Sequence, residues 1–460
     1  MSCQEVDKTP LSGKILHHSL QRQLHPESCM MFVPAKVSLH RPHLLMPTFT
    51  LRRCHIQLLC VILLVTIVLV VWTVSNLRNT FVSFHAESDT DGELVVLPED
   101  FAKERDAFCL DGSPAGYYIR NGRGSSLNFW ILHLQGGTWC STESECYKRS
   151  FTEVGSSLKA PVSARFEGFM SSDDLVNPDF HDWNMVCFLY CDGGSFLGNR
   201  SQPIVYNSRN IYLRGASIFD AIIDFLLIET NLGSAKKVIL SGSSAGGLAA
   251  LIHADHLHQR LQKIPSFHAV LDAMLFLNLT SRNGQKKMMN ILENTFHLHN
   301  IKDSVSLKDC SQSVPDEIKW QCFSPVYFYR HVFTPAFFLN SVHDRWYLNQ
   351  ALDITCDFKK CSSSDIKYIS DIKSSLLDIV REIFTSHKDG RYLTACPVHS
   401  VLVNRFYSQP LAGHISPQKA IGDWYFGRIS STTKIIPRED IREAISVCYK
   451  YFNEEENTLM

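Results

Sequence analysis

The chain has 460 residues, with 45 basic and 46 acidic side chains and a formal net charge of −1. A near-neutral chain without a basic stripe offers no electrostatic basis for nucleic-acid binding, so we expect no nucleic-acid partner. The length allows one large α/β domain in addition to an N-terminal region.

The amino-acid composition changes at two points within the first hundred residues. Residues 1–53 mix Pro, His, Ser and Gln without periodicity, which is typical of a disordered cytosolic tail. The range 54–74 contains Ile56–Val74, a run without charged side chains that is long enough to cross a bilayer as a helix. Basic residues prevail before this run and acidic residues after it, in 75–100, which predicts a cytosolic N-terminus.

This distribution predicts a single-pass type II membrane protein held in the membrane by a signal anchor at 54–74. Its catalytic domain would then be lumenal or extracellular, in the Golgi or at the cell surface. The alternative is a cleaved signal peptide and a secreted protein, although the apolar region of such peptides is usually shorter. The polar and acidic range 75–100 indicates a stalk, and we expect one catalytic domain at 101–460, beginning near Phe101.

Cysteines and sequons agree with a lumenal domain. Eleven of the 15 cysteines follow the predicted span, a number that favours disulfides in an oxidising compartment. Their spacing forms no zinc pattern, so we expect no metal. An odd count leaves one thiol over, for which we choose Cys187 in an apolar run. Asn199 and Asn278 begin Asn-x-Ser/Thr sequons and are candidate glycosylation sites.

Beyond the stalk, short apolar runs alternate with helical patterns. The runs are typical of strands buried on both faces, and they lie at 127–134, 184–191, 236–242, 268–273, 335–341 and 390–396. Residues 215–229 and 245–261 have helical spacing. This alternation predicts an α/β fold with a mostly parallel sheet flanked by helices. The polar stretch 282–330 is interpreted as an insertion or lid.

One serine among several lies in a nucleophile motif. Residues 242–246 read Gly-Ser-Ser-Ala-Gly, so Ser244 has glycine two positions before and two positions after it. This G-x-S-x-G pattern, after a strand and before a helix, is typical of a sharp turn that exposes a nucleophilic serine. A phosphate-binding loop or a plain helix cap is the alternative, but no lysine follows the glycines as a phosphate loop requires.

A nucleophilic serine needs a base and an acid, which follow it in the order Ser, acid, His. Asp344 follows the predicted strand 335–341 and is our first choice as the acid. Asp272 has a similar position and is the alternative. His399 follows the last predicted strand and is our choice as the base, with His387 and His414 as rivals.

Acyl transfer also needs N–H donors for the developing oxyanion. We expect the backbone of Ala245, directly after the serine, to supply one donor. Gly137 and Thr138 follow an apolar strand and are expected to supply the others. The alternative for this loop is a tight turn without catalytic meaning. His253 and His256 could form a metal pair on one helix face, but no third ligand is evident.

Seven stretches between about Phe101 and Arg428 carry a family pattern; they read CLDGSPAGYYIRNG, LQGGTWC, NPDFHDWNMVCFLYCDGGSFLGN, IYLRGASIFDAIIDFL, LSGSSAGGLAAL, FFLNSVHDRW and AIGDWYFGR. Together they resemble the pectinacetylesterase/Notum family of α/β-hydrolases. The resemblance implies that Ser244, Asp344 and His399 are nucleophile, acid and base. It further implies that Gly137, Thr138 and Ala245 line the oxyanion hole.

The family resemblance also implies four disulfides, Cys109–Cys191, Cys140–Cys146, Cys310–Cys322 and Cys356–Cys361, and Cys396–Cys448 is then the remaining pair. Two positions depart from the plant-type pattern. Gln135 stands where those enzymes have glutamate, and Ser400 stands where they have a cysteine just after the catalytic histidine. Neither departure removes a member of the triad.

The resemblance leaves the substrate open. Pectinacetylesterases remove acetyl groups from polysaccharide, whereas Notum removes a long unsaturated fatty acyl group from a signalling protein. The motif at 190–196 is closer to the acetylesterases, so we favour an esterase that removes O-acetyl groups without a cofactor. The alternatives are a Notum-like deacylase of a lipidated protein and a catalytically inactive glycan-binding relative.

Overall fold

The computed structural model of the chain describes residue 66 and residues 91–412, 414–428, 434–437 and 440–448. The predicted cytosolic tail, all but one residue of the predicted span and most of the predicted stalk therefore lie outside the described residues. Among the helices of the described part, none is long and apolar enough to cross a membrane. The described residues from 91 onward belong to one compact unit.

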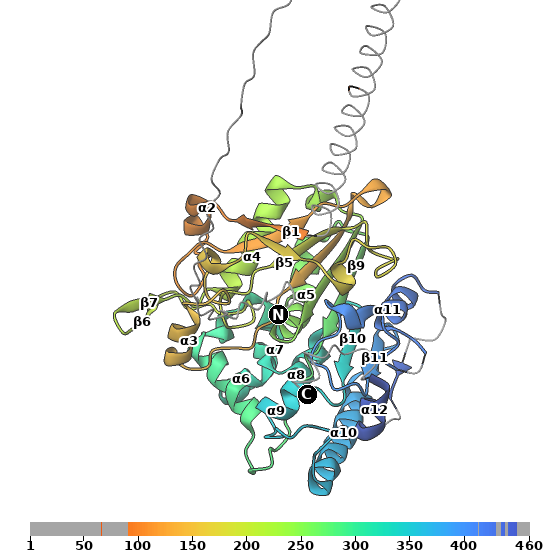
Figure 1. The fold of residues 1–460 in the computed structure, drawn as a ribbon. Helices are drawn as coiled ribbons and strands as arrows, with labels where there is room; N and C mark the ends of the chain where they lie inside the picture. Colours follow the sequence, from red (N-terminus) through yellow and green to blue (C-terminus); the bar gives the residue numbers. More distant parts are fainter. Residues whose placement is uncertain (1–65, 67–90, 413, 429–433, 438–439, 449–460) are drawn as a thin grey trace, which may run out of the picture. The chain divides into compact units, whose positions relative to one another are not determined.

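A ten-stranded mixed sheet lies at the centre of this unit, in the order β12-β11-β10-β9-β8-β3-β5-β2-β1-β4 (Figure 1). Strands β12 to β5 in this order are parallel, and the pairs β5–β2, β2–β1 and β1–β4 are antiparallel. The sheet strands are β1 (Asp91–Val96), β2 (Gly116–Arg120), β3 (Phe129–Leu134), β4 (Ser163–Arg165), β5 (Asn184–Phe188), β8 (Lys237–Ser243), β9 (Ser266–Asp272), β10 (Ala336–Ser341), β11 (Gly390–Thr394) and β12 (Lys434–Ile435). A separate antiparallel hairpin consists of β6 (Ile204–Tyr206) and β7 (Arg209–Ile211).

Helices flank the sheet, and several of them follow the strands that carry the candidate site. They are α2 (Glu99–Glu104), α3 (Glu143–Arg149), α4 (Gly215–Glu229), α5 (Ala245–Arg260), α6 (Lys287–Leu298), α7 (Lys308–Ser313), α8 (Pro325–Phe328), α9 (Arg345–Gln350), α10 (Ser363–Ile383), α11 (Pro417–Tyr425) and α12 (Ile441–Cys448). Helix α5 packs against β3, β8 and β9. The predicted insertion at 282–330 contains α6, α7 and α8, joined by short 3₁₀ turns.

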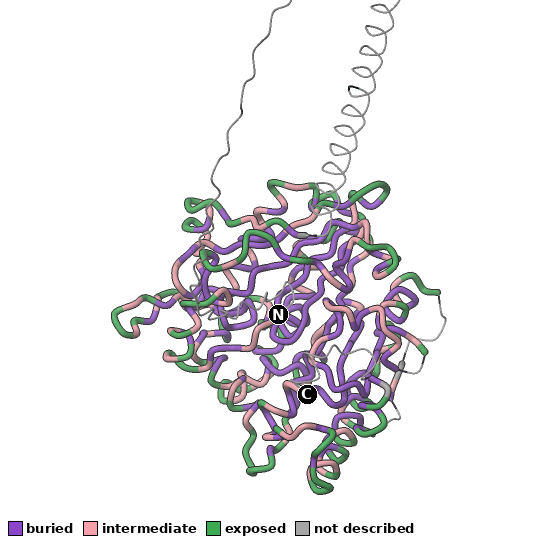
Figure 2. Tube along the Cα trace, viewed as in Figure 1, coloured by how far each residue is buried: buried purple, intermediate pink, exposed green. Residues whose placement is uncertain are grey.

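Burial explains why the strands were recognisable in the sequence. All residues of β5, β10 and β11 are buried, and β5 and β10 each contain a run of four apolar residues. Figure 2 shows the buried part of the chain concentrated in the sheet and in α5, with exposed residues at the edges.

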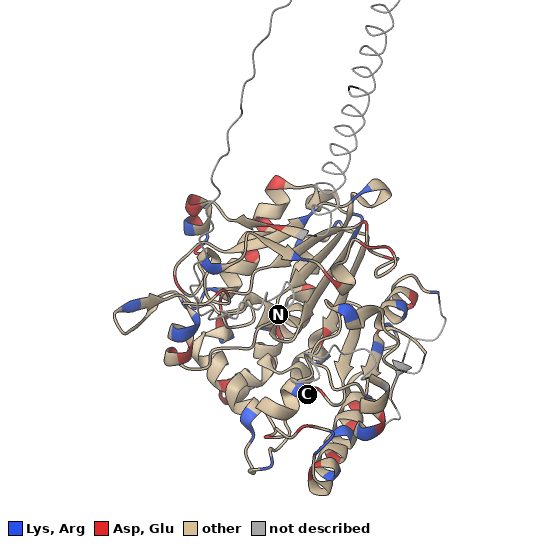
Figure 3. Ribbon diagram, in the orientation of Figure 1, with Lys and Arg blue, Asp and Glu red and all other residues tan. Residues whose placement is uncertain are grey.

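Helix α10 has a different pattern, because only one of its faces is buried. Basic and acidic residues are interspersed along this helix (Figure 3). Two ion pairs join residues three or four positions apart on this helix, Lys367–Asp371 and Arg381–Asp378. Such spacing places the partners next to each other on a helix surface, so the pairs support the helix locally.

The six predicted strands and the two predicted helices are present, and the predicted fold class is confirmed. The sequence did not reveal β1, β2, β4, β12 or the β6–β7 hairpin. Strand β1 lies inside the range 75–100 that we predicted to be a stalk, so the sheet begins near Asp91 rather than near Phe101. The charged and glycine residues in its first half concealed it. The other missed strands are short or only partly buried.

Five disulfides connect ten of the eleven described cysteines; four are the pairs that the resemblance implied, and the fifth is the pair that then remained. They are Cys109–Cys191, Cys140–Cys146, Cys310–Cys322, Cys356–Cys361 and Cys396–Cys448. The prediction that Cys187 carries the unpaired thiol is wrong, because Cys187 is also disulfide-bonded. Its burial within β5 is as we expected.

Candidate active site

Ser244 lies on a strained turn between β8 and α5. Its backbone has φ 58° and ψ −125°, a positive-φ conformation that is uncommon for a residue with a side chain. Two glycines make the turn possible. A Cβ at Gly242 would lie 2.1 Å from the carbonyl oxygen of Gly246, and a Cβ at Gly246 would lie 2.0 Å from that of Leu134. The glycine spacing that singled out Ser244 therefore has a steric cause.

The three residues predicted as nucleophile, base and acid form one chain of hydrogen bonds. His399 Nε2 lies 2.9 Å from Ser244 Oγ. On the other side of the ring, His399 Nδ1 lies 2.8 Å from Asp344 Oδ2 and 3.0 Å from Oδ1. Asp344 follows β10 and caps α9 by accepting the N–H of Tyr347. The fold thus joins residues separated by 55 and 155 positions.

The environment of His399 suits a base. Burial lowers the pKa of its imidazole, but the charge of Asp344 and the hydrogen bond to it outweigh this effect, so the pKa is raised above the ordinary value. The side chain of His399 is 22 % exposed, whereas that of Asp344 is 8 % exposed. The base is therefore accessible from outside, and the acid behind it is shielded.

The predicted oxyanion loop lies against the turn that carries Ser244. A Cβ at Gly136 would approach Ser244 Cβ to 3.0 Å, so the absence of a side chain allows this close approach. Gly137 and Thr138 have φ of 149° and 59°. Within the described residues, the N–H groups of Gly137, Thr138 and Ala245 donate no hydrogen bond to another protein group. These three donors are thus available to a ligand oxygen.

The stretch at 190–196 supports this loop from behind. The Tyr190 hydroxyl donates to the carbonyl oxygen of Thr138 at 2.6 Å and accepts the N–H of Ser195 at 3.1 Å. The Ser195 hydroxyl accepts from Trp139 Nε1 at 2.7 Å and donates to the carbonyl oxygen of Ala245 at 2.8 Å. Tyr190 and Ser195 are fully buried. This stretch therefore connects both sides of the predicted oxyanion hole.

Both departures from the plant-type pattern have a structural counterpart. Gln135 Oε1 accepts the N–H of Tyr190 at 3.0 Å, so a neutral amide provides an acceptor at this position. Ser400 has a positive φ of 66°, and its carbonyl oxygen accepts from the side chain of Asn404. The disulfide Cys396–Cys448 begins three residues before His399 and anchors the loop from that side.

Asp272, the alternative acid, does not bond to His399. Its Oδ2 accepts from Ser243 Oγ at 3.0 Å and from the N–H groups of Val401 and Leu402 at 2.9 and 3.0 Å. Burial raises its pKa to about 6, although these hydrogen bonds act in the opposite direction. Asp272 thus ties the turn of the candidate nucleophile to the loop of His399.

Four aromatic rings pack beside the triad. Trp346 stacks on His399 with ring centroids 5.3 Å apart. Trp139, next to the oxyanion loop, lies 4.8 Å from Phe276, 6.3 Å from Phe323 and 6.4 Å from Trp346. Trp139, Phe276 and Phe323 are buried. We call these four residues the aromatic wall; it fills space between the oxyanion loop and His399.

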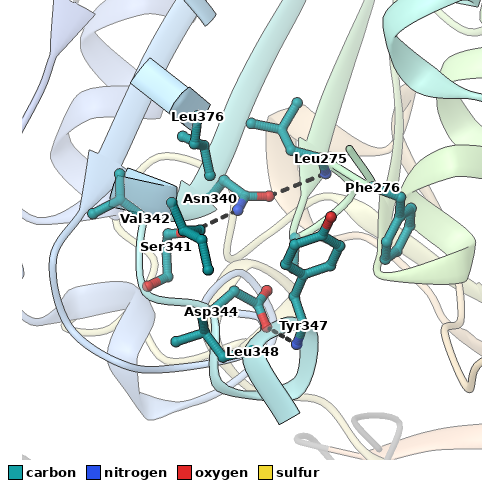
Figure 4. Close-up of a pocket in the computed structure, with 11 residues that line it drawn as sticks. Leu275, Phe276, Asn340, Ser341, Val342, Asp344, Tyr347, Leu348 and Leu376 are labelled. Carbon is teal, nitrogen blue, oxygen red and sulfur yellow. Dashed lines mark hydrogen bonds between the residues drawn. The ribbon is translucent and has the colours of Figure 1, made fainter. Parts of the chain in front are cut away.

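A small pocket lies behind the acid, on the side of Asp344 that α10 covers (Figure 4). Its volume is about 10 Å³, room for about one water molecule. Asn340 spans this region, accepting from the N–H of Leu275 and donating to the carbonyl oxygen of Ser341. Neither Ser244 nor His399 lines the pocket, so it is not a site for an acyl chain.

The remaining histidine candidates have other positions. His387 and His414 are exposed, whereas His399 bonds to both other members of the predicted triad. His253 bonds to the carbonyl oxygen of Phe196 through Nε2 and to Ser306 through Nδ1. His256 contacts Asp220. Since both ring nitrogens of His253 have protein partners, the possible pair of His253 and His256 is not arranged as a metal site.

One cluster of metal-ligating residue types does occur in the described part of the chain. Cys140, Cys146 and His299 place a ligand atom each within 4.8 Å of one another. The two sulfurs are bonded to each other, so they cannot act as thiolate ligands. His299 Nε2 instead donates to the carbonyl oxygen of Cys140 at 2.9 Å.

The two sequons differ in their surroundings. Asn278 is exposed, whereas Asn199 is partly buried and its side-chain amide donates to the carbonyl oxygen of Asp303 at 3.0 Å. Asn278 is therefore the more accessible candidate.

One supporting residue escaped the sequence analysis, and another was considered there in a different role. Arg149 bonds to the carbonyl oxygen of Gly137, and Asp272 acts on two loops rather than as the acid. The sequence signal for Arg149 was weak, because it lies at the end of a short helix among other charged residues. The signal for Asp272 was its place at the end of a buried strand.

Comparisons with known proteins identify the family of the chain. The sequence model described as Pectinacetylesterase matches residues 86–440. Pectin acetylesterase 5 of Arabidopsis thaliana is 34 % identical over 73 % of this chain and 81 % of its own length. The palmitoleoyl-protein carboxylesterase NOTUM of Homo sapiens is 26 % identical over 69 % of this chain and 63 % of its own length.

A solved structure shows the same fold. The Wnt deacylase Notum from Drosophila matches with a TM-score of 0.66 and 22 % identity, covering 76 % of this chain and 97 % of that chain. At this level of identity the match establishes the α/β-hydrolase fold alone. The extent of the family match and the identity to the plant enzyme show that the chain belongs to the pectinacetylesterase family of carboxylic ester hydrolases.

Proposed function

We propose that this chain is a serine esterase that removes O-acetyl groups from a polysaccharide through Ser244, His399 and Asp344. The observation that carries the proposal is the continuous hydrogen-bond chain from Asp344 through His399 to Ser244. A hydroxyl becomes a competent nucleophile when a base accepts its proton and an acid orients that base.

In the first half of the reaction, Ser244 Oγ attacks the ester carbonyl and its proton moves to His399 Nε2. Asp344 stabilises the imidazolium that forms. The N–H groups of Gly137, Thr138 and Ala245 bind the oxyanion of the tetrahedral intermediate. His399 then gives the proton to the departing alcohol oxygen, which leaves an acyl group on Ser244.

In the second half, His399 accepts a proton from water, and the resulting hydroxide attacks the acyl-enzyme carbonyl. The same N–H groups bind the second oxyanion. Its collapse breaks the bond to Ser244 Oγ, and the proton on His399 returns to that oxygen. The products are a carboxylic acid and the free serine.

The aromatic wall favours a short acyl group. It places four packed rings beside the reacting atoms, and three of the side chains are buried. An acetyl group needs room for one methyl, whereas a fatty acyl chain needs a deep apolar cavity. The identity to the plant enzyme, which is named a pectin acetylesterase, supports the same choice.

The alternative is a carboxylesterase that removes a fatty acyl group from a secreted protein. It is supported by the match to NOTUM, which is named a palmitoleoyl-protein carboxylesterase. A displaced Phe276 or Trp139 would open an apolar space beside Trp346, the ring that stacks on His399. The two candidates share the triad and differ in the length of the acyl chain.

The first test is replacement of the nucleophile in the full chain. Ser244→Ala should lower kcat by at least about three orders of magnitude, because members of a triad act as a unit. The matched control is Ser241→Ala on the same strand, whose hydroxyl contacts His133 rather than the triad. Retained hydrolysis in a folded Ser244→Ala protein would contradict the assignment.

The second test is a panel of esters from acetyl to palmitoleoyl, assayed with the full chain. We expect kcat/KM to be highest for acetyl and to fall as the acyl chain lengthens. A preference for chains of about eight carbons or more would favour the fatty-acyl alternative. Hydrolysis of none of the esters, together with binding of a glycan, would favour an inactive relative.

We also propose that the catalytic domain is lumenal and that residues 54–74 anchor it in the membrane. Five disulfides support an oxidising compartment. Treatment with a glycosidase should increase the electrophoretic mobility of the protein. Asn278→Gln should abolish most of this shift, whereas Asn199→Gln should change it less. Protection of the domain from protease in sealed microsomes checks the orientation, and digestion there would contradict it.

A further inference from the structure

Arg149 places a buried positive charge behind the predicted oxyanion loop. It is the last residue of α3, and its Nη1 donates to the carbonyl oxygen of Gly137 at 2.7 Å. Its Nε donates to the carbonyl oxygen of Val154 at 2.8 Å, which fixes the plane of the guanidinium. The guanidinium carbon lies 4.9 Å from the ring centroid of Tyr190. These contacts hold the cation against one peptide group of the loop.

That peptide group is the one that links Gly137 to Thr138. In a trans peptide the C=O and the following N–H point in opposite directions. Since Arg149 fixes the carbonyl of Gly137, it also fixes the N–H of Thr138, which points away from the guanidinium. This N–H is one of the three predicted oxyanion donors, and within the described residues it has no protein acceptor.

The contact also affects the strength of the donor. A hydrogen bond from a cation to a carbonyl oxygen polarises the peptide, so that its N–H becomes a better donor. This polarisation is larger where water is excluded. Burial lowers the pKa of Arg149, and the charges of Tyr190 and Asp192 act in the opposite direction. Arginine keeps its charge under these conditions.

We propose that Arg149 is a positioning residue of the oxyanion hole, which orients and polarises the Thr138 N–H through the Gly137 carbonyl. Tyr190 completes the arrangement, because its hydroxyl holds the next carbonyl, that of Thr138. Arg149 itself touches no reacting atom. The inference rests on the proposed function, since it assumes that Ser244 attacks a carbonyl within reach of this N–H.

The test replaces Arg149 by methionine, which keeps the apolar stem and removes the cation. Arg149→Met should lower kcat about 10- to 100-fold per active site, less than the loss of a whole oxyanion donor. KM should change little, because the oxyanion forms only after binding. A trifluoromethyl ketone labelled with ¹³C at its carbonyl gives a second measurement. Addition of Ser244 Oγ to this carbonyl transfers the serine proton to His399 and leaves a hemiketal oxyanion.

The ¹³C shift of the hemiketal, followed against pH, reports the pKa of this oxygen. Arg149→Met should raise that pKa, because the oxyanion loses stabilisation. If Arg149 had only a structural role, fewer active sites would form the hemiketal, but the pKa of the hemiketal oxygen in those sites would stay unchanged. That result would overturn the inference. The matched control is Arg209→Met, which removes an arginine that stacks on Phe151, whereas the donor to the Gly137 carbonyl is Arg149. The control should keep both kcat and the hemiketal pKa.

A second variant covers the case in which Arg149→Met does not fold. Arg149→Lys keeps a charge but loses the planar fork, so it should raise the hemiketal pKa by a smaller amount. A wild-type pKa and a wild-type kcat in Arg149→Lys would then overturn the inference. Activity in Ser244→Ala would overturn the proposed function, whereas an inactive Ser244→Ala beside a fully active Arg149→Met would overturn this inference alone.

Discussion

The two sides of the candidate site carry buried groups of opposite charge. Behind the oxyanion loop lies the cation Arg149, and behind the loop of His399 lies the carboxylate of Asp272. In the proposed acyl transfer, negative charge develops on the first side and positive charge on the second. Arg149 and Asp272 therefore each have the sign that stabilises the charge formed next to them. The comparison shows that support for the site extends beyond the residues that contact the substrate.

The two sides also differ in how they are connected to the fold. The oxyanion side is held by neutral hydrogen bonds from Tyr190 and Ser195 in addition to the cation. The histidine side depends on carboxylates, Asp344 directly and Asp272 through backbone N–H groups. We thus expect substitutions on the histidine side to move the pH profile through the pKa of His399. The oxyanion side also holds a buried carboxyl, Asp192, whose pKa burial raises to about 6.

The largest effect should follow from Asp344→Asn. It should lower kcat by about 10³- to 10⁴-fold, because the amide no longer orients the correct tautomer of His399. The charge of Asp344 raises the pKa of His399, and activity requires the neutral imidazole. The acid limb of the kcat/KM profile should therefore move to lower pH. An unchanged limb in a folded variant would contradict this account.

An intermediate effect is expected for Asp272→Asn. Three donors converge on Asp272 Oδ2, so the substitution should displace the loop of His399 and lower kcat about ten-fold. Asp272 also raises the pKa of His399, so the acid limb should again move to lower pH, by less than in Asp344→Asn.

The control for Asp272 is Asp255→Asn. Asp255 likewise accepts backbone N–H groups, those of Phe333 and Thr334, but it contacts neither Ser244 nor His399. The control substitution should lower the midpoint of thermal unfolding without moving the pH profile. Equal pH profiles for the two variants would show that Asp272 has only a structural role.

The smallest effect is expected for Ser195→Ala on the oxyanion side. The substitution removes the acceptor of Trp139 Nε1 and the donor to Ala245, two neutral hydrogen bonds worth about 1 kcal/mol each. We expect kcat to fall less than about ten-fold, with no shift of the acid limb. The kcat/KM profiles of Ser195→Ala and Asp272→Asn are measured side by side. A shift of the acid limb in Ser195→Ala would show that the oxyanion side and the histidine side do not differ in their effect on the pH profile.

Local patterns were sufficient where one segment contains the whole signal. The glycines around Ser244 predicted the turn, because any side chain at Gly242 or Gly246 would collide with backbone. Asp344 and His399 could be placed after strands, because the carboxyl ends of parallel strands meet at one edge of a sheet. The disulfide pairs followed from the family resemblance rather than from spacing.

Other features depended on contacts between distant segments. The stalk boundary was misplaced because β1 becomes recognisable only through its pairing with β2 and β4. Arg149 gave only a weak signal, since its role depends on one carbonyl twelve positions away in a loop of unusual backbone geometry. Asp272 was considered as the acid because its sequence position resembles that of Asp344.

The sequence alone determined the fold class, the family resemblance and the identity of the residues that form the triad geometry, because these depend on periodicity and short motifs. The tertiary structure decided how those residues are supported: the cation behind Gly137, the carboxylate shared by two loops, and the aromatic wall beside His399. Such support depends on directions and distances between segments far apart in the chain, and a linear pattern does not contain them.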